Sequence, residues 1–225
     1  MVLAVTLGVT ILVVFMVHGA VRRLKKNSLF SLMVAMILFG WLLVVVVLGP
    51  TRFFAINPLV APNIILGFLL LFILLKKAYS SHFIQTIADA IPQHWIIGLQ
   101  IYRIVGISFF NLYNAGVLPA AFALSAGYGD IFVGVTAPFV AYAYFKKTFF
   151  ARKLAIAWNC VGILDLVVAI SIGIFGFPRP LQVLPLTPST EPLALYPLVV
   201  IPLFAVPLAL ILHIVSLRFL LKKVG

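Results

Sequence analysis

Seven apolar runs make up most of this sequence, and each is long enough to cross a bilayer as a helix. A helix needs about 20 apolar residues to cross the roughly 30 Å of membrane hydrocarbon. With 64% hydrophobic and 9% charged residues, the chain cannot cover its apolar surface with polar groups, so lipid must be its solvent. We therefore expect an all-α, polytopic membrane protein whose seven transmembrane helices span approximately residues 2–20, 29–48, 58–75, 94–116, 129–145, 154–176 and 196–217.

The basic residues predict the orientation of these helices. Thirteen Lys and Arg residues fall on one side of a sevenfold thread, whereas Arg52 and Arg179 fall on the other and Arg103 lies within a span. Loops rich in Lys and Arg stay in the cytoplasm, so the N-terminus is expected outside and the C-terminus inside. The net charge of +12 then reflects membrane topology, and nucleic acid is not expected as a partner. The thirteen are Arg22, Arg23, Lys25, Lys26, Lys76, Lys77, Lys146, Lys147, Arg152, Lys153, Arg218, Lys222 and Lys223.

The informative residues are unevenly distributed along a single membrane domain, residues 1–225. Residues 1–75 contain three bland apolar helices, and 76–93 is expected to form an amphipathic cytoplasmic connection on the membrane surface. Residues 94–225 hold most of the polar and small residues within spans, so we expect a functional four-helix bundle there. Its outer segment 177–195 is rich in proline and is expected to be an extended cap.

Polar residues of the fourth span are predicted to share one helical face. At 100° per residue, four of them fall within an arc of about 80°. Four polar side chains cannot face hydrocarbon without a large cost, so this stripe is expected to look into the bundle. The four are Gln100, Arg103, Asn111 and Asn114.

Asp165 is an acidic residue in the middle of the sixth span, with Asn159 on the same helix. Arg103 and Asp165 both lie about 14–17 Å from the cytoplasmic starts of their spans, which predicts an ion pair near the bilayer midplane. A pair of Arg103 with Asp130 is the alternative. Small residues on the same faces as these aspartates should allow close helix packing: Gly134, Ala137, Ala141, Gly162, Ala169, Gly173 and Gly176.

The buried charges leave several functions open. Small-solute or proton-coupled transport, or ligand sensing, would use Arg103 for an anion or ion pair, Asp165 for a proton, and Asn111 and Asn114 for ligand contacts. Alternatively, the ion pair only fixes helix register in a non-catalytic membrane subunit or assembly partner, in contact with other membrane helices or a second copy. Phosphate-loop, dinucleotide-binding, zinc-protease and serine-hydrolase motifs are absent from the sequence, so an enzyme is not expected.

Histidines support a third hypothesis, a haem or redox protein. His18 and His213 are predicted at similar depth near the cytoplasmic side, and His94 lies near the same level. Two imidazoles offered at one level could ligate haem or a metal, although no HxxxH or CxxCH spacing is present. We expect these side chains to have interfacial or structural roles.

The last span contains prolines at a regular interval: Pro197, Pro202 and Pro207. Each proline lacks a backbone donor and frees a carbonyl one turn earlier in the helix. Freed carbonyls need partners within a membrane, so this helix is expected to be bent and packed against protein or water.

Three stretches resemble a group of uncharacterised bacterial integral membrane proteins. They are RIVGISFFNLYNAGVLPAAFALSAGYGDIFVGVTAP (103–138), WNCVGILDLVVAI (158–170) and YPLVVIPLFAVPLALILHIVSL (196–217). The similarity extends over roughly residues 95–220 and leaves the first three spans unmatched. It implies a seven-helix protein of the bacterial cytoplasmic (inner) membrane and carries no ligand or reaction.

Overall fold

The computed structural model describes residues 1–55, 63, 64, 67, 69, 73, 76, 80–178 and 183–222, and its regular structure there is entirely helical. The predicted third span, 58–75, falls mostly outside the described residues. Six described helices are long and apolar enough to cross a membrane. The α-helices are α1 (Val2–Arg23), α2 (Leu29–Leu48), α4 (His82–Asp89), α5 (Gln93–Leu99), α6 (Ser108–Asn114), α7 (Ala120–Phe145), α8 (Ala151–Phe175) and α9 (Val206–Leu221). Short 3₁₀ turns occur at Gly49–Thr51 (η1), Phe53–Ala55 (η2) and Glu191–Ala194 (η4).

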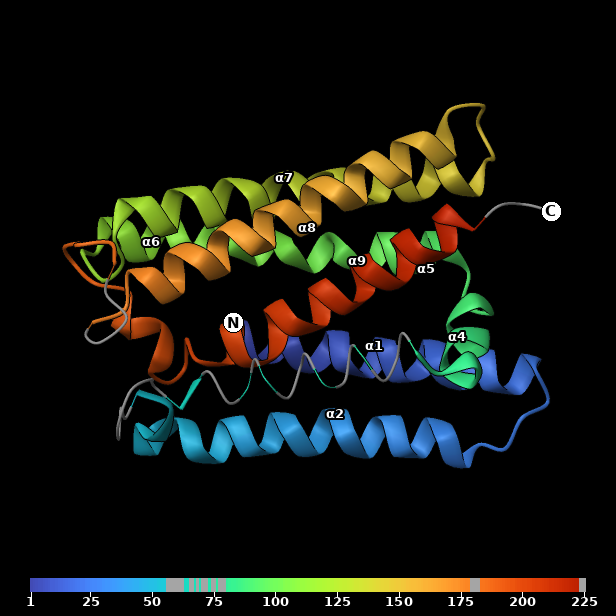
Figure 1. Cartoon of the computed structure of the whole chain (residues 1–225), viewed down its shortest axis with the longest axis horizontal. Coiled ribbons are helices and arrows are strands. Elements are labelled where there is room, and N and C mark those ends of the chain that lie inside the picture. Colours follow the sequence, from blue (N-terminus) through green and yellow to red (C-terminus); the bar gives the residue numbers. More distant parts are fainter. Residues whose placement is uncertain are drawn as a thin grey trace.

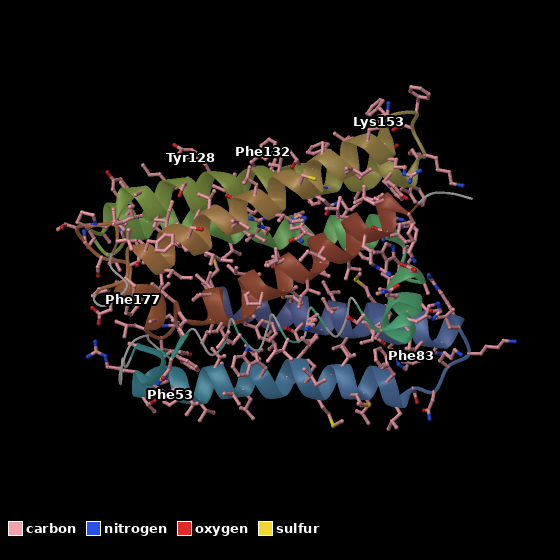
Figure 2. All side chains as sticks on the ribbon, viewed as in Figure 1. Phe53, Phe83, Tyr128, Phe132, Lys153 and Phe177 are labelled. Atoms are coloured by element: carbon pink, nitrogen blue, oxygen red, sulfur yellow. The ribbon has the colours of Figure 1, made fainter. Side chains whose placement is uncertain are left out.

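The long helices lie side by side along the longest axis of the molecule, with α9 crossing obliquely between the α1–α2 pair and the α7–α8 pair (Figure 1). Large apolar side chains cover the outside: Tyr128 and Phe132 on α7 are 67% and 53% exposed and point away from the bundle (Figure 2). Such a surface would be unstable in water and suits contact with lipid. The finding supports a membrane protein of at least six spanning helices.

Basic residues from distant parts of the chain meet at one end of this bundle. On α4, Asp89 forms ion pairs with both Arg218 and Lys222. Arg23 reaches the backbone oxygen of Ala90, and Arg152 donates to the backbone oxygen of Lys222. α4 and the C-terminal end of α9 lie at the same end of the bundle in Figure 1. Asp89 therefore binds the basic C-terminal end of α9, and Arg23 and Arg152 reach the same region through backbone oxygens.

Two helix boundaries differ from those predicted. α7 begins at Ala120, well before the predicted residue 129, because Pro119 starts the helix in extended conformation and the following turns, although weakly apolar, remain helical. The last span begins at Ile201 instead of residue 196 and continues to Leu221. Its first α-helical residue is Val206, after a π-helical segment Ile201–Ala205 (η5).

The fourth span is continuous in space but changes helix type. A 3₁₀ segment, Gln100–Ile107 (η3), separates α5 from α6. A 3₁₀-helix has three residues per turn, so residues three apart lie on one line. The buried residues of η3 are on such a line: Gln100, Arg103 and Gly106, and buried Phe109 follows three residues later. This geometry aims Arg103 into the bundle.

The π-helical segment is the structural consequence of the predicted prolines. Pro207 has no N–H for the carbonyl of Leu203, and the indole N–H of Trp41 on α2 donates to that oxygen at 2.8 Å. The Tyr102 hydroxyl donates to the oxygen of Ala205 at 2.9 Å. Side chains from α2 and η3 therefore satisfy this irregular backbone, which explains how it persists inside the bundle.

Replacing Trp41 with phenylalanine should lower the free energy of unfolding by about 0.5–1.5 kcal/mol, because it removes the donor to the Leu203 oxygen and retains most of the apolar contact. Unfolding of the purified protein in detergent can measure this. Trp95 is 41% exposed, and its indole N–H has no hydrogen bond within the described part of the chain, so Trp95→Phe is the matched control and should change stability much less. Equal losses in both variants would contradict the role assigned to the indole N–H.

Candidate functional site

Arg103 is the centre of a charged cluster inside the bundle. Its side chain is 2% exposed, and its Nε donates to Asp130 Oδ1 on α7 at 2.7 Å. Its Nη2 donates to Asp165 Oδ2 on α8. The predicted contact between Arg103 and Asp165 is thus present, and the alternative partner, Asp130, is present with it. One guanidinium therefore binds two carboxylates that come from different helices.

His213 on α9 contacts the third nitrogen of the Arg103 guanidinium. Its Nε2 lies 3.3 Å from Arg103 Nη1 and its Nδ1 lies 2.9 Å from Asn159 Oδ1. Asn159 Nδ2 donates to the Ala155 oxygen and to Ser216 Oγ, which fixes Oδ1 as the acceptor. His213 must then donate from Nδ1 and accept at Nε2, so the imidazole in this arrangement is neutral. The network orients Arg103 and contributes no charge of its own.

Three glycines give the members of this cluster room to approach. A Cβ on Gly106 would overlap the Asp130 side chain, and one on Gly129 would overlap the Asp165 carboxylate. A Cβ on Gly162 would overlap the His213 ring. Each ionisable partner is therefore placed against a glycine of the neighbouring helix, which is the close approach that small residues allow in membranes. Gly162 belongs to the predicted small-residue face, whereas Gly106 and Gly129 do not.

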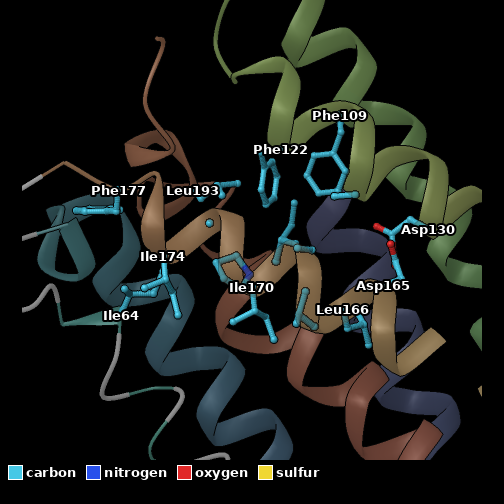
Figure 3. A pocket seen from close by; sticks show the side chains of 16 residues that line it. Ile64, Phe109, Phe122, Asp130, Asp165, Leu166, Ile170, Ile174, Phe177 and Leu193 are labelled. Carbon is cyan, nitrogen blue, oxygen red and sulfur yellow. The ribbon is translucent and has the colours of Figure 1, made fainter. Parts of the chain in front are cut away.

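Two cavities adjoin the cluster. Cavity 1, of ≈ 60 Å³, has Asp130 and Asp165 at one end and extends between apolar side chains to Leu193 and Phe177 (Figure 3). Phe177 lies at the end of the bundle opposite Lys153 (Figure 2). Cavity 2, of ≈ 50 Å³, is lined by Arg103 and Asp130 among others. It also includes Ser108, whose buried hydroxyl has no partner among the described residues. Both carboxylates keep some exposure, 20% for Asp130 and 14% for Asp165.

The predicted amide stripe is not formed, and this part of the prediction is wrong. Asn111 and Asn114 are exposed on α6, whereas Gln100 and Arg103 are buried. The prediction assumed a rotation of 100° per residue, the value for an α-helix, throughout the fourth span. The 3₁₀ segment adds about 20° per residue over η3, which turns Asn111 and Asn114 to about the opposite face. Gln100 keeps its inward position, and its Nε2 donates to the Ala209 oxygen at 3.1 Å.

The three histidines that were considered as haem or metal ligands have different partners in the structure. His18 lies 3.1 Å from Ser31 Oγ on α2, and His94 packs against the Phe145 ring. His213 is instead committed on both nitrogens to the Arg103 cluster. Among the residues that the structure describes, no group of three or more His, Cys, Asp or Glu side chains could hold a metal ion. His213 is the cluster member whose role the sequence did not indicate, although it lies on one helical face with Ala209, Ser216 and Leu220.

Comparison with known proteins places most of the chain in one family. Residues 61–221 match a family model described as a domain of unknown function, DUF8737. No curated protein and no solved structure matches the chain. Because the match covers well over half of its residues, this protein belongs to the DUF8737 family. The matched region includes every member of the Arg103 cluster, and the family carries no activity to transfer.

Proposed function

We propose that this protein transfers protons across a membrane, whether or not a small solute is present, using Asp130 and Asp165 as the binding groups. One observation carries the proposal: a single guanidinium faces two carboxylates in the interior of a lipid-facing bundle. With both carboxylates ionised and His213 neutral, the cluster has one negative charge in excess. An uncompensated charge inside a membrane is costly, so the cluster favours an exchangeable positive charge, the simplest being a proton.

The surroundings of the two carboxylates support exchange of a proton more than they support a purely structural role. Arg103 uses one oxygen of each carboxylate, and the second oxygens, Asp130 Oδ2 and Asp165 Oδ1, have no hydrogen bond among the described residues. Both side chains line cavity 1. A cluster that only fixed helix register would be stabler with one carboxylate per guanidinium and no adjoining space.

We also propose the sevenfold topology, with the N-terminus outside and the C-terminus in the cytoplasm. η2 and α4 lie at opposite ends of the bundle (Figure 1), which supports a further crossing at 58–75. The convergence of basic residues around Asp89 supports that end as the cytoplasmic one. The resemblance to bacterial proteins favours a bacterial inner membrane.

Proton transfer can be tested with purified protein in liposomes that contain a pH-sensitive dye. A potassium gradient with valinomycin sets a potential, negative inside, that drives protons inward. We expect acidification faster than in protein-free liposomes, and a decrease of about tenfold or more in Asp165→Asn, since the neutral amide can neither carry a proton nor provide the excess charge.

Asp89→Asn is the matched control, because it removes a carboxylate of the basic end and leaves the interior cluster intact. Its proton flux should equal that of the original protein. If the original protein acidifies liposomes no faster than lipid alone, or if Asp165→Asn retains full flux, the cluster is structural and the proposal is wrong.

A further inference from the structure

We propose that cavity 1 binds a short-chain alkylammonium ion, with its ammonium group at the Asp130 and Asp165 carboxylates and its alkyl chain among the apolar side chains. This inference rests on the proposed function and names the solute. The ammonium ion would replace the proton at the same two carboxylates. Binding of one would then release the other, so the two cations would compete for one site.

The charge of the site selects a monovalent cation. Arg103 neutralises one of the two carboxylates, and each carboxylate retains an oxygen without a hydrogen bond among the described residues. An ammonium group has up to three N–H donors and one positive charge, which matches two free acceptors and one excess negative charge. An anion would meet the excess negative charge, and a divalent cation would leave the interior with a net positive one.

The lining of the cavity favours an alkylammonium ion over a bare metal ion. Apart from Asp130 and Asp165, every residue that lines cavity 1 is apolar, including Phe109, Phe122 and Leu193. Metal cations such as Ca²⁺ or Mg²⁺ need six or more oxygen ligands or retained waters. An alkyl chain instead gains contact with apolar walls, which include the edge-to-face rings of Phe109 and Phe122, with centroids 5.4 Å apart.

The volume of the cavity limits the length of the chain. Cavity 1 measures ≈ 60 Å³. A water-sized group occupies roughly 10–15 Å³ on this measure, so the cavity admits about four to six non-hydrogen atoms, and hexylammonium has about seven. Propylammonium has four. Methylammonium would leave the apolar end empty, and hexylammonium would exceed the space.

The test uses the full chain in lipid nanodiscs and follows its thermal unfolding with millimolar additions of propylammonium, hexylammonium, propanol or propionate. We expect propylammonium to raise the midpoint in a saturable manner. The neutral isostere and the anion should not raise it, and hexylammonium should act more weakly. The apparent affinity for propylammonium should fall by tenfold or more in Asp165→Asn and should be unchanged in Asp89→Asn.

A second variant tests the cavity without altering its charges. Gly173 lines cavity 1, and a Cβ there would meet Leu193 and Phe122 at 3.7 Å, an ordinary contact. Gly173→Leu should therefore fold and fill the cavity, with loss of the propylammonium effect. Gly8→Leu, at a glycine with open space around its Cβ position, should retain it.

Three results would overturn this inference. A propylammonium effect that survives Gly173→Leu, or equal effects from propylammonium and propanol, would overturn the assignment of the alkylammonium to cavity 1. Proton flux that depends on Asp165, with no response to any alkylammonium, would overturn this inference and leave the proposed function standing.

Discussion

Replacement of Arg103 by leucine should lower the free energy of unfolding by about 3–5 kcal/mol, the largest loss expected from any single change in the cluster. The variant leaves Asp130 and Asp165 with no guanidinium between them, inside a bundle that provides no other cation among the residues of the cluster. It also removes the hydrogen bond that faces His213 Nε2. The loss can be measured by denaturant or thermal unfolding in a mild detergent.

The three charged side chains of the cluster predict how this loss can be recovered. Arg103→Leu combined with Asp165→Asn still leaves Asp130 unpaired, so stability should return only in part. The triple variant, with Asp130→Asn added, has no buried charge and should recover most of the loss. Recovery by the double variant to the level of the triple variant would indicate a simple pair of Arg103 with Asp165, and additive losses would indicate that these side chains do not interact.

Six of the seven expected spans are described, and they were predictable because membrane thickness sets their length. Their boundaries were less predictable. The chain from Ala120 to Gly129 is only weakly apolar, which hid the first turns of α7, although Pro119 marks the start of that helix. In the last span, Pro202 and Pro207 indicated irregular backbone, and the structure has a π-helical segment there. Trp41, which donates to that segment, comes from residues 1–75, where the sequence predicted only bland apolar helices.

The site was predictable where depth alone determined it. Arg103 and Asp165 carry opposite charge at similar depth, which was enough to predict their contact. The exposed positions of Asn111 and Asn114 depend on the 3₁₀ geometry of η3, which local polarity did not reveal. The role of His213 depends on the oblique path of α9 between the other helices (Figure 1), and the imidazole contacts Arg103 and Asn159, which belong to two different helices.

Gly134 on α7 should tolerate no larger side chain, because its neighbour is backbone. A Cβ at this position would lie 2.6 Å from the backbone nitrogen of Ile104 and 3.1 Å from the carbonyl carbon of Arg103. Backbone atoms of η3 cannot rotate away as a flexible side chain could. Gly134→Ala should therefore lower the free energy of unfolding by about 1–3 kcal/mol, even though alanine is the better helix former by about 1 kcal/mol.

Gly98 provides the matched control, since it lies on α5, against the same helix. A Cβ there would meet only the Cβ of Ala141, at 3.5 Å, so Gly98→Ala should be neutral or slightly stabilising. Because Gly134 packs directly on the backbone of Arg103, its substitution should also move the guanidinium and reduce proton flux, whereas Gly98→Ala should not. Equal stability and flux in the two variants would show that close approach of α7 and η3 does not position the cluster.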